Sequence, residues 1–293
     1  MAATDITGQS LGRSICLILR KGRLLARGID IFKASLREFF LPQFQSSLRL
    51  HNRPVAVLSH PLDGSLPFVP SLVRRYLGYL SIWLKTLLFL YRTYGEAALR
   101  DIERMMTDLV LLYNTSGRVY QRCQSTTPSR RTPLGNPYFF LILLFDPHLH
   151  CIPSLHVLTV CYNYRQIRKM VMKFDPQGAN NSEAVEQAYR LAVEITETIL
   201  LVKQHSLLDI GPSLYLLSRL FPDYDDAEVY RFVADLFADN PMVGPERALP
   251  IRELILEEYE KIKVDESRRQ EQEPIHALLR YLEGYLKISL SIG

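Results

Sequence analysis

Apolar residues recur at helical spacing along most of the chain. Residues 14–44 carry apolar side chains three or four positions apart, with arginine and lysine between them, and Met105, Leu109 and Leu112 form one stripe of a later segment. This spacing is typical of helices that bury one face. Alternating, strand-like stretches are rare. The pattern therefore predicts an all-α fold.

The same periodicity sets the boundaries of the expected helices. Gly95 and the pair Gly211-Pro212 indicate breaks, because glycine and proline disfavour a helix interior. The expected helices cover residues 14–44, 71–94, 96–113, 154–174, 182–208, 213–220, 225–239, 250–264 and 273–288.

The remaining segments are expected to connect these helices. Prolines spread over residues 54–70 indicate an irregular connection, and residues 175–181 indicate a turn. Residues 266–273 are charged and are expected to form a solvated link. The apolar run 138–145 is long enough for one strand or two helical turns.

Three segments are expected along the chain. An N-terminal helical segment with its proline-rich connection covers residues 1–70. A core covers residues 71–220, and a helical extension covers residues 221–293. The core contains both motifs described below.

The polar stretch 114–137 is predicted to be a long loop. It contains three prolines and four arginines, namely Arg118, Arg122, Arg130 and Arg131. Long irregular loops in compact domains often carry function. A mobile surface loop without a functional role would explain the same composition.

Composition excludes some classes of function. The 293 residues carry a net charge of +4, and no dense run of lysine and arginine interleaved with aromatic residues indicates nucleic-acid binding. The four cysteines form no CxxC pair, which favours free thiols. The N-terminus shows no secretory signal pattern.

One segment raises the question of a membrane. Residues 76–91 are apolar but are interrupted by Lys85 and flanked by Arg74, Arg75 and Arg92. A spanning helix needs roughly 20 mostly apolar residues. The segment is therefore expected to be a buried core helix or an amphipathic helix at a membrane surface.

Two short motifs carry the candidate chemistry. Residues 151–157 read CIPSLHV and place Ser154 and His156 at the start of a helix, where backbone N–H groups favour an anion. Residues 203–209 read KQHSLLD and place Asp209 four positions after His205. On a helix these two side chains would share one face, so that the carboxylate could orient the imidazole.

Together these motifs resemble the type 2 phosphatidic acid phosphatase superfamily. That superfamily reads K-x6-RP, then PSGH, then SR-x5-H-x3-D, and a branch similar to inositol phosphorylceramide synthases reads PSLHV and TKQH-x3-D. This chain has PSLHV and KQH-x3-D at a similar separation. The resemblance covers residues 118–211, and it implies a helical bundle like the phosphatase and haloperoxidase core, here with additional N- and C-terminal helices.

The resemblance also implies roles for individual residues. His205 corresponds to the nucleophile that becomes phosphohistidine, and Asp209 to its orienting carboxylate. His156 corresponds to the general acid, and Ser154 to a phosphate ligand. Neither a metal nor a cofactor is implied, because fixed cations can stabilise the phosphate.

The sequence departs from the family at its cationic positions. The family's arginine six positions before the second histidine is replaced by Ile199, and Lys203 is the expected substitute. The K-x6-RP motif has no matching copy. Arg122, Arg130 and Arg131 are the nearest candidates for phosphate ligands.

Two other classes of function compete with this hypothesis. His148, His150, Cys151 and His156 lie close in sequence and could bind zinc, although their spacing matches no common zinc motif. A catalytically inactive helical scaffold that binds a lipid or a partner would also explain the apolar helices. Within the phosphatase hypothesis, water and an alcohol remain open as acceptors.

The expected partners follow from the resemblance. They are a phosphorylated lipid or a small phosphoester, together with a membrane surface; nucleic acid is not expected, and the oligomeric state is open. The protein is expected at a membrane, as a peripheral protein on the cytoplasmic side.

Overall fold

Helices make up most of the described chain. The structure is a computed structural model that describes residues 5–133, 135–176, 182–270 and 272–290. Its longer elements are α1 (Leu11–Arg20), α2 (Gly22–Ala34), a π-helical segment (Ser35–Phe40), α3 (Leu41–Ser47), β1 (Val55–Val57), α4 (Val73–Leu77), α5 (Tyr79–Tyr94), α6 (Leu99–Tyr120), β2 (Gln124–Thr126), α7 (Pro137–Phe145), α8 (Leu155–Phe174), α9 (Ser182–Leu201), α10 (Ile210–Leu220), α11 (Asp226–Asp235), α12 (Pro245–Arg269) and α13 (Pro274–Leu290). The shorter elements are 3-10 turns at Pro61–Gly64, Pro70–Leu72, Gly95–Ala98 and Leu207–Asp209. The predicted all-α class is confirmed.

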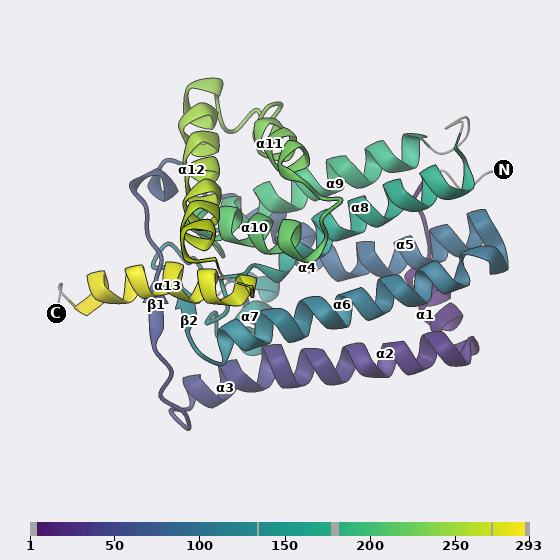
Figure 1. The fold of residues 1–293 in the computed structure, drawn as a ribbon, viewed down its shortest axis with the longest axis horizontal. Coiled ribbons are helices and arrows are strands. Elements are labelled where there is room, and N and C mark those ends of the chain that lie inside the picture. Colours follow the sequence, from purple (N-terminus) through teal and green to yellow (C-terminus); the bar gives the residue numbers. More distant parts are fainter. Residues whose placement is uncertain (1–4, 134, 177–181, 271, 291–293) are drawn as a thin grey trace.

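The long helices lie side by side along the long axis of the molecule. Helices α2, α5, α6, α8 and α9 run roughly parallel to this axis, while α12 stands across one end of the stack (Figure 1). Helix α8 contacts α5, α6, α9 and α10, and most of its length is buried. The core is therefore built around α8, the helix that begins at the PSLHV motif.

A two-stranded parallel sheet lies at one end of the bundle. Strand β1 pairs with β2, with Ala56 opposite Ser125. An isolated bridge adds His150 to Ser125. This pairing ties the proline-rich connection and the segment before α8 together, and both lead into the candidate site.

Helix α6 and the loop after it differ from the prediction. The helix continues through the polar turn Thr115, Ser116 and Gly117 to Tyr120, so the loop predicted over residues 114–137 begins seven positions later. The polar turn is buried, and a Cβ at position 117 would lie 2.3 Å from Glu38 Oε2. Close packing on the π-helical segment thus overrides the turn-forming composition.

Two predicted boundaries near the second motif are also wrong. Helix α9 ends at Leu201 rather than Leu208, and Lys203 adopts a left-handed backbone with φ of 56°. Helix α10 includes Gly211 and Pro212 in its first turn, where the missing N–H of proline costs no hydrogen bond. The break between the two helices therefore lies before Asp209, whereas the sequence predicted it after Asp209, at Gly211 and Pro212.

Helices α11 and α12 differ from the expected ranges. Helix α11 is shorter than the predicted 225–239, whereas α12 begins at Pro245 and continues to Arg269, so the first half of the link predicted at residues 266–273 is helical. Glu266 is buried and accepts a hydrogen bond from Arg219, which removes it from solvent. The apolar run 138–145 forms helix α7. The turn predicted at residues 175–181 lies mostly outside the described residues.

The three predicted segments pack on one another. Helix α2 packs on α6, α10 packs on α12, and α13 contacts β1. The division into 1–70, 71–220 and 221–293 stays a prediction.

Helix α5, the candidate for a membrane segment, lies in the core. Trp83 and the five consecutive residues 86–90 are buried, so this part of the helix is enclosed on all sides. No helix in the described ranges combines the length and the apolar character that crossing a bilayer requires. Of the two expectations for this segment, the structure shows the core helix.

Gly211 permits the close approach of α10 and α12. A Cβ at this position would lie 2.7 Å from the Ile255 carbonyl oxygen and 2.9 Å from the Tyr259 nitrogen, both of them backbone atoms. We expect Gly211→Ala to lower the free energy of unfolding by about 1–3 kcal/mol, because helix backbones must separate. Guanidinium unfolding measures the change. Gly22→Ala is the matched control, since no atom lies within 4 Å of its added Cβ; an equal loss in both variants would contradict the packing argument.

Candidate active site

The two motifs meet at the N-terminus of α8. His156 lies in the first turn of that helix, and His205 lies in the turn that follows α9. Their ring centroids are 5.3 Å apart, and the ring planes meet at 73°. Both side chains are more than nine-tenths buried. Residues 49 positions apart in sequence thus share one small site.

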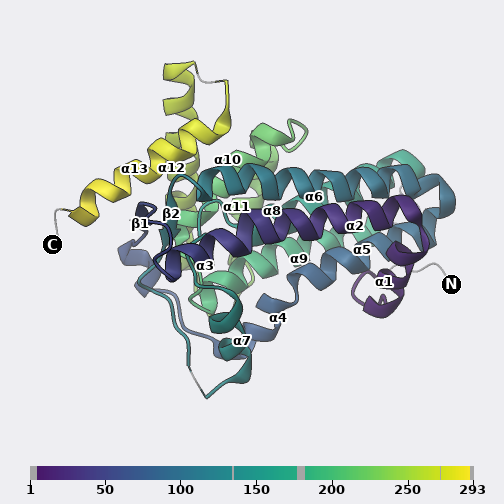
Figure 2. The same cartoon turned by 90° about the horizontal axis from the view of Figure 1, so that it is seen from below.

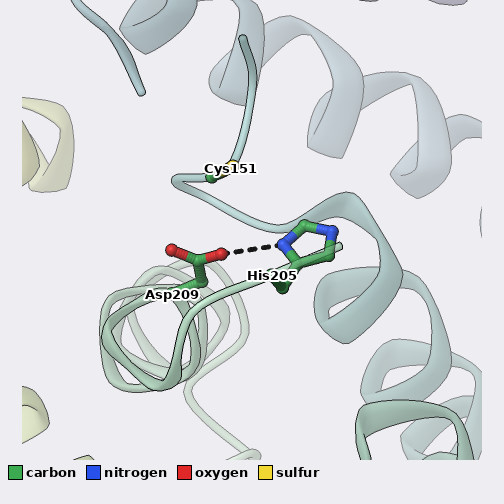
Figure 3. A group of neighbouring side chains, drawn as sticks. All are labelled: Cys151, His205 and Asp209. Carbon is green, nitrogen blue, oxygen red and sulfur yellow. Dashed lines mark hydrogen bonds and ion pairs between the residues drawn. The ribbon is translucent and has the colours of Figure 1, made fainter. Parts of the chain in front are cut away.

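The imidazole of His205 is oriented by Asp209. Its Nδ1 lies 2.8 Å from Asp209 Oδ2, and the other ring nitrogen lies on the opposite side of the ring (Figure 3). Because a carboxylate accepts, Nδ1 carries the proton and Nε2 keeps its lone pair. This arrangement leaves Nε2 as the atom that can attack an electrophile.

The contact between the two residues does not arise from a regular helix. Ser206 caps a short 3-10 turn, and its backbone N–H donates to the same Asp209 Oδ2 at 3.0 Å. The Ser206 Oγ accepts from the Leu208 N–H in return. The expected contact between His205 and Asp209 therefore forms, but through a capping box rather than through one helical face.

Asp63 holds this turn in place from the proline-rich connection. Its carboxylate accepts from Ser206 Oγ and from the Leu207 N–H, both at 2.8 Å, and from the His60 N–H at 3.0 Å. Asp63 is buried. The Lys203 ammonium donates to the Asp63 carbonyl oxygen. Asp63, some 140 positions away in sequence, thus holds residues on both sides of His205, namely Lys203 and Ser206.

His156 is surrounded by aromatic rings. The centroids of Tyr76 and Tyr79 lie 4.4 Å and 4.1 Å from its ring. Burial lowers the pKa of His156 well below its usual value, and the neighbouring rings of His205 and His148 lower it further. The ring is therefore neutral at neutral pH before any anion binds.

The start of α8 is connected to the start of α10 by hydrogen bonds. The Ser154 N–H donates to Ser213 Oγ at 2.7 Å, and Ser213 Oγ donates to the Asp209 carbonyl oxygen at 2.6 Å. The Ser154 hydroxyl is buried and has no partner within the described residues. It is thus a buried polar group without a partner in the described residues, two positions before His156.

His148 also lies close to His205, with ring centroids 6.2 Å apart. Its Nε2 donates to the Gln204 carbonyl oxygen, and its Nδ1 lies 3.2 Å from Thr126 Oγ1. Burial lowers the pKa of His148 to about 4, and the nearby Arg130 acts in the same direction. A neutral His148 therefore holds the backbone of Gln204, the residue directly before His205, through this hydrogen bond.

The pKa of Asp209 is shifted upward, whereas the pKa values of His148 and His156 are shifted downward. Burial raises the pKa of Asp209 to about 6, although the hydrogen bonds from His205 and Ser206 oppose this rise. One oxygen, Oδ1, is buried without a hydrogen-bond partner in the described part of the chain. The carboxylate is therefore less stable as an ion than an exposed aspartate.

These side chains border a small cavity. Its volume is about 10 Å³, which is room for about one water molecule. The lining residues are Phe39, Tyr79, Asp146, His148, His150, Cys151, Leu155, His156 and His205. A phosphate group is larger than this space, so binding one requires neighbouring side chains to move.

The predicted cationic phosphate ligands lie outside the lining of the cavity. Arg130 donates to Gln204 Oε1 at 3.2 Å and to the Asp146 carbonyl oxygen at 2.9 Å. Arg131 is exposed, and its backbone N–H donates to the Lys203 carbonyl oxygen. Arg122 is exposed beyond the end of α6, and none of the cationic candidates borders the cavity.

One group of side chains could hold a metal ion. Cys151, His205 and Asp209 each offer a donor atom, and these atoms lie within 4.8 Å of one another (Figure 3). Sulfur, nitrogen and oxygen donors suit zinc. The four residues predicted from the sequence, His148, His150, Cys151 and His156, all line the cavity, but only Cys151 belongs to the group whose donor atoms lie within 4.8 Å of one another in the described residues. A metal at the observed group would compete with the hydrogen bond between His205 and Asp209.

Several residues of the site were not predicted from the sequence. Asp63, Ser213, Tyr76 and Tyr79 reach the motifs only through the fold. The one local signal is at Asp63, where residues 60–63 form a capping box that starts with His60. That signal predicts a turn but not the turn's distant partner.

Comparison with known proteins adds no relative. No protein-family model, no curated protein and no solved structure matches the chain.

The buried histidines make stability depend on pH. His148 binds a proton below about pH 4 in the folded protein and below 6.5 in the unfolded chain. The unfolded chain therefore binds more protons between these values, so stability falls as pH falls through 6.5. His150 and His156 are shifted in the same direction. Asp209, protonated below about 6 when folded and below 3.8 when unfolded, has the opposite effect.

We expect the free energy of unfolding to fall by roughly 3 kcal/mol between about pH 7.5 and about pH 5.5. Each of the three histidines contributes a loss of about 1.4 kcal/mol and Asp209 a gain of about 0.8 kcal/mol over this interval. Urea unfolding at both pH values measures the difference. His148→Gln should remove about a third of the histidine effect, whereas His51→Gln, at an exposed position, should leave it intact. A stability that rises on acidification would contradict the burial of neutral histidines.

Proposed function

We propose that this protein is a metal-independent phosphatase or phosphotransferase that acts through a phosphohistidine at His205. The observation that carries this proposal is the hydrogen bond between His205 Nδ1 and Asp209, which leaves Nε2 as the free nucleophile beside His156. The core would resemble that of the type 2 phosphatidic acid phosphatases. A lipid phosphate is the proposed substrate, because the resemblance of the two motifs to that superfamily implies it.

The first step would transfer the phosphoryl group to the enzyme. Nε2 of His205 attacks phosphorus, and the bond between phosphorus and the leaving oxygen breaks. The leaving oxygen takes a proton from His156, and Asp209 stabilises the cationic ring through Nδ1–H. In the second step, water or an alcohol loses a proton to His156 and attacks phosphorus, and the nitrogen–phosphorus bond breaks.

The low pKa of His156 constrains the first step. A neutral imidazole is too weak an acid to give its remaining N–H proton to the leaving oxygen. A bound phosphate would raise the pKa of His156, because a nearby negative charge favours the imidazolium. A phosphate monoester, with a second pKa of about 6, can bring that proton as its monoanion. The proton would therefore arrive with the substrate.

Arg130 is the proposed cation for the transferred phosphate. It is the predicted arginine whose charge lowers the pKa of His148, so it is electrostatically close to the cavity. Its present bonds to Gln204 and to the Asp146 carbonyl oxygen would have to be exchanged for phosphate oxygens. Lys203 would act by positioning, since its ammonium bonds the Asp63 carbonyl oxygen.

An inactive helical scaffold is the second candidate. The observation that favours it is the small volume of the cavity, which leaves no room for a phosphate unless side chains move. In a scaffold, the hydrogen bond between His205 and Asp209 would serve the fold alone. The two candidates differ in one measurable respect, the turnover of a phosphoester.

Phosphate release in the presence of a chelator tests the proposal. The substrates are phosphatidic acid in detergent micelles and an aryl phosphate. We expect turnover by the wild type, none above background by His205→Ala, and a loss of about 10²–10⁴-fold in His156→Ala with phosphatidic acid. His51→Ala is the matched control, because this histidine is exposed.

Each outcome selects one candidate. Turnover that is lost in chelator and restored by zinc would support a metal site at Cys151, His205 and Asp209 and contradict the phosphohistidine route. Equal turnover by the wild type and His205→Ala would also contradict it. No turnover from folded protein on either substrate would favour the scaffold.

A further inference from the structure

Helix α7 exposes an unusual amount of apolar surface. It consists of nine residues, PYFFLILLF, and contains no charged side chain. Its large apolar residues are between 42% and 56% exposed at five positions, namely Phe140, Leu141, Leu143, Leu144 and Phe145. Contiguous apolar surface of this kind marks an interaction site.

The helix is nevertheless firmly attached to the fold. Phe139 and Ile142 are buried, and the ring of Phe139 lies 6.0 Å from that of Phe68. Helix α7 also contacts α4. Figure 2 shows α7 at the lower edge of the molecule, away from the long helices. The buried side fixes the helix, while the exposed residues face outward.

Arginines lie at both ends of α7. At its start, the Arg74 guanidinium lies 4.7 Å from the centre of the Tyr138 ring. At its end, the Arg130 guanidinium donates to the carbonyl oxygen of Asp146, the residue that caps the helix. Arg131 is exposed on the preceding loop. An apolar centre with cationic ends matches the layers of an anionic lipid surface.

We propose that α7 is a docking helix that inserts its exposed apolar side chains into the surface of an anionic phospholipid bilayer. Nine helical residues extend about 13 Å, which is too short to span the hydrocarbon core, so the helix would lie in the interface. Arg74 and Arg131, both exposed, would contact lipid phosphates. Tyr138 would lie at headgroup depth, as tyrosines do at membrane surfaces.

The distribution of the exposed residues favours a lipid surface over a protein groove. A helix that docks into a groove presents a stripe at i, i+3, i+4 and i+7. Here adjacent positions 143, 144 and 145 are all exposed and apolar. A lipid surface accepts such a broad apolar tip, because lipid chains adapt to its shape. Leu77 and Leu80, at the neighbouring end of α4 and start of α5, are also exposed.

The docking helix leads directly into the candidate site. Phe145 is followed by Asp146, Pro147 and His148, and both Asp146 and His148 border the cavity. Insertion of α7 would therefore bring the cavity close to the headgroup layer. The docking surface goes beyond the proposed function and does not require it, since an inactive scaffold could bind membranes through the same helix.

Flotation of the full chain with vesicles tests the docking surface. The vesicles contain phosphatidylcholine alone or equal parts of phosphatidylcholine and phosphatidylserine. We expect binding to the anionic vesicles at low salt and weaker binding at high salt, where the arginine contribution is screened. The triple variant Phe140→Ser, Leu144→Ser, Phe145→Ser should bind at least about tenfold less, because large apolar side chains no longer enter the lipid.

A matched variant controls for general surface hydrophobicity. Phe32→Ser with Leu36→Ser removes two exposed apolar side chains from α2 and the π-helical segment, and it should bind as the wild type does. Fluorescence gives a second measurement. Trp83 is buried and is the chain's single tryptophan, so Phe140→Trp adds one exposed reporter, whose emission should shift to the blue on anionic vesicles.

Three results would overturn the proposal. The first is the absence of wild-type binding to anionic vesicles at low salt. The second is an equal loss of binding in the α7 and α2 variants. The third is a dimer of the wild type without lipid that the α7 substitutions abolish and the α2 substitutions do not. The last result would assign α7 to a protein interface. None of these measurements depends on catalysis, so a failed docking surface and a failed phosphatase remain distinguishable.

Discussion

The candidate site depends on how the buried carboxylate of Asp63 is satisfied. An ionised carboxylate in the core is costly unless several donors surround it, and three donors do so here: the Ser206 hydroxyl, the Leu207 N–H and the His60 N–H. Two of them belong to the turn that carries the second motif. The turn therefore has one low-energy position, and it presents His205 toward α8 and Asp209 toward the Nδ1 of His205.

The electrostatics of the site follow from the same burial. Without water, His148 and His156 lose affinity for protons and Asp209 gains it. The site therefore holds little net positive charge before a ligand arrives, although a phosphate would be attracted by cations. Under the proposed function, the binding of an anion and the protonation of His156 are coupled, and the substrate supplies the proton that makes His156 a general acid. The small cavity agrees with a site that rearranges on binding rather than one that stands open.

The sequence predicts the helical class and the contact between His205 and Asp209, because both depend on local patterns, whereas the meeting of the two motifs is expected only from the family resemblance. Helix periodicity is local, and the four-residue spacing of His205 and Asp209 keeps them close in either a helix or a capped turn. The sequence does not predict where polar turns end, because Ser116 and Gly117 lie in a buried helical turn and Gly117 packs closely against Glu38, a residue far away in sequence. The roles of Asp63, Tyr76 and Tyr79 are also invisible in sequence, since they arise from contacts between distant segments. The exposure of α7 follows from the fold alone, because its composition equally suits a buried helix.

Trapping of the phosphoenzyme tests the central claim most directly. An aryl phosphate with an acidic leaving group needs no proton from His156, so His156→Ala should form the phosphoenzyme and hydrolyse it slowly. Rapid quenching in alkali, followed by mass spectrometry, would then locate the phosphoryl group. Acid-labile, alkali-stable phosphate on the peptide that contains His205 is the predicted result. Turnover with an unmodified His205, or with phosphate on another residue, would contradict it.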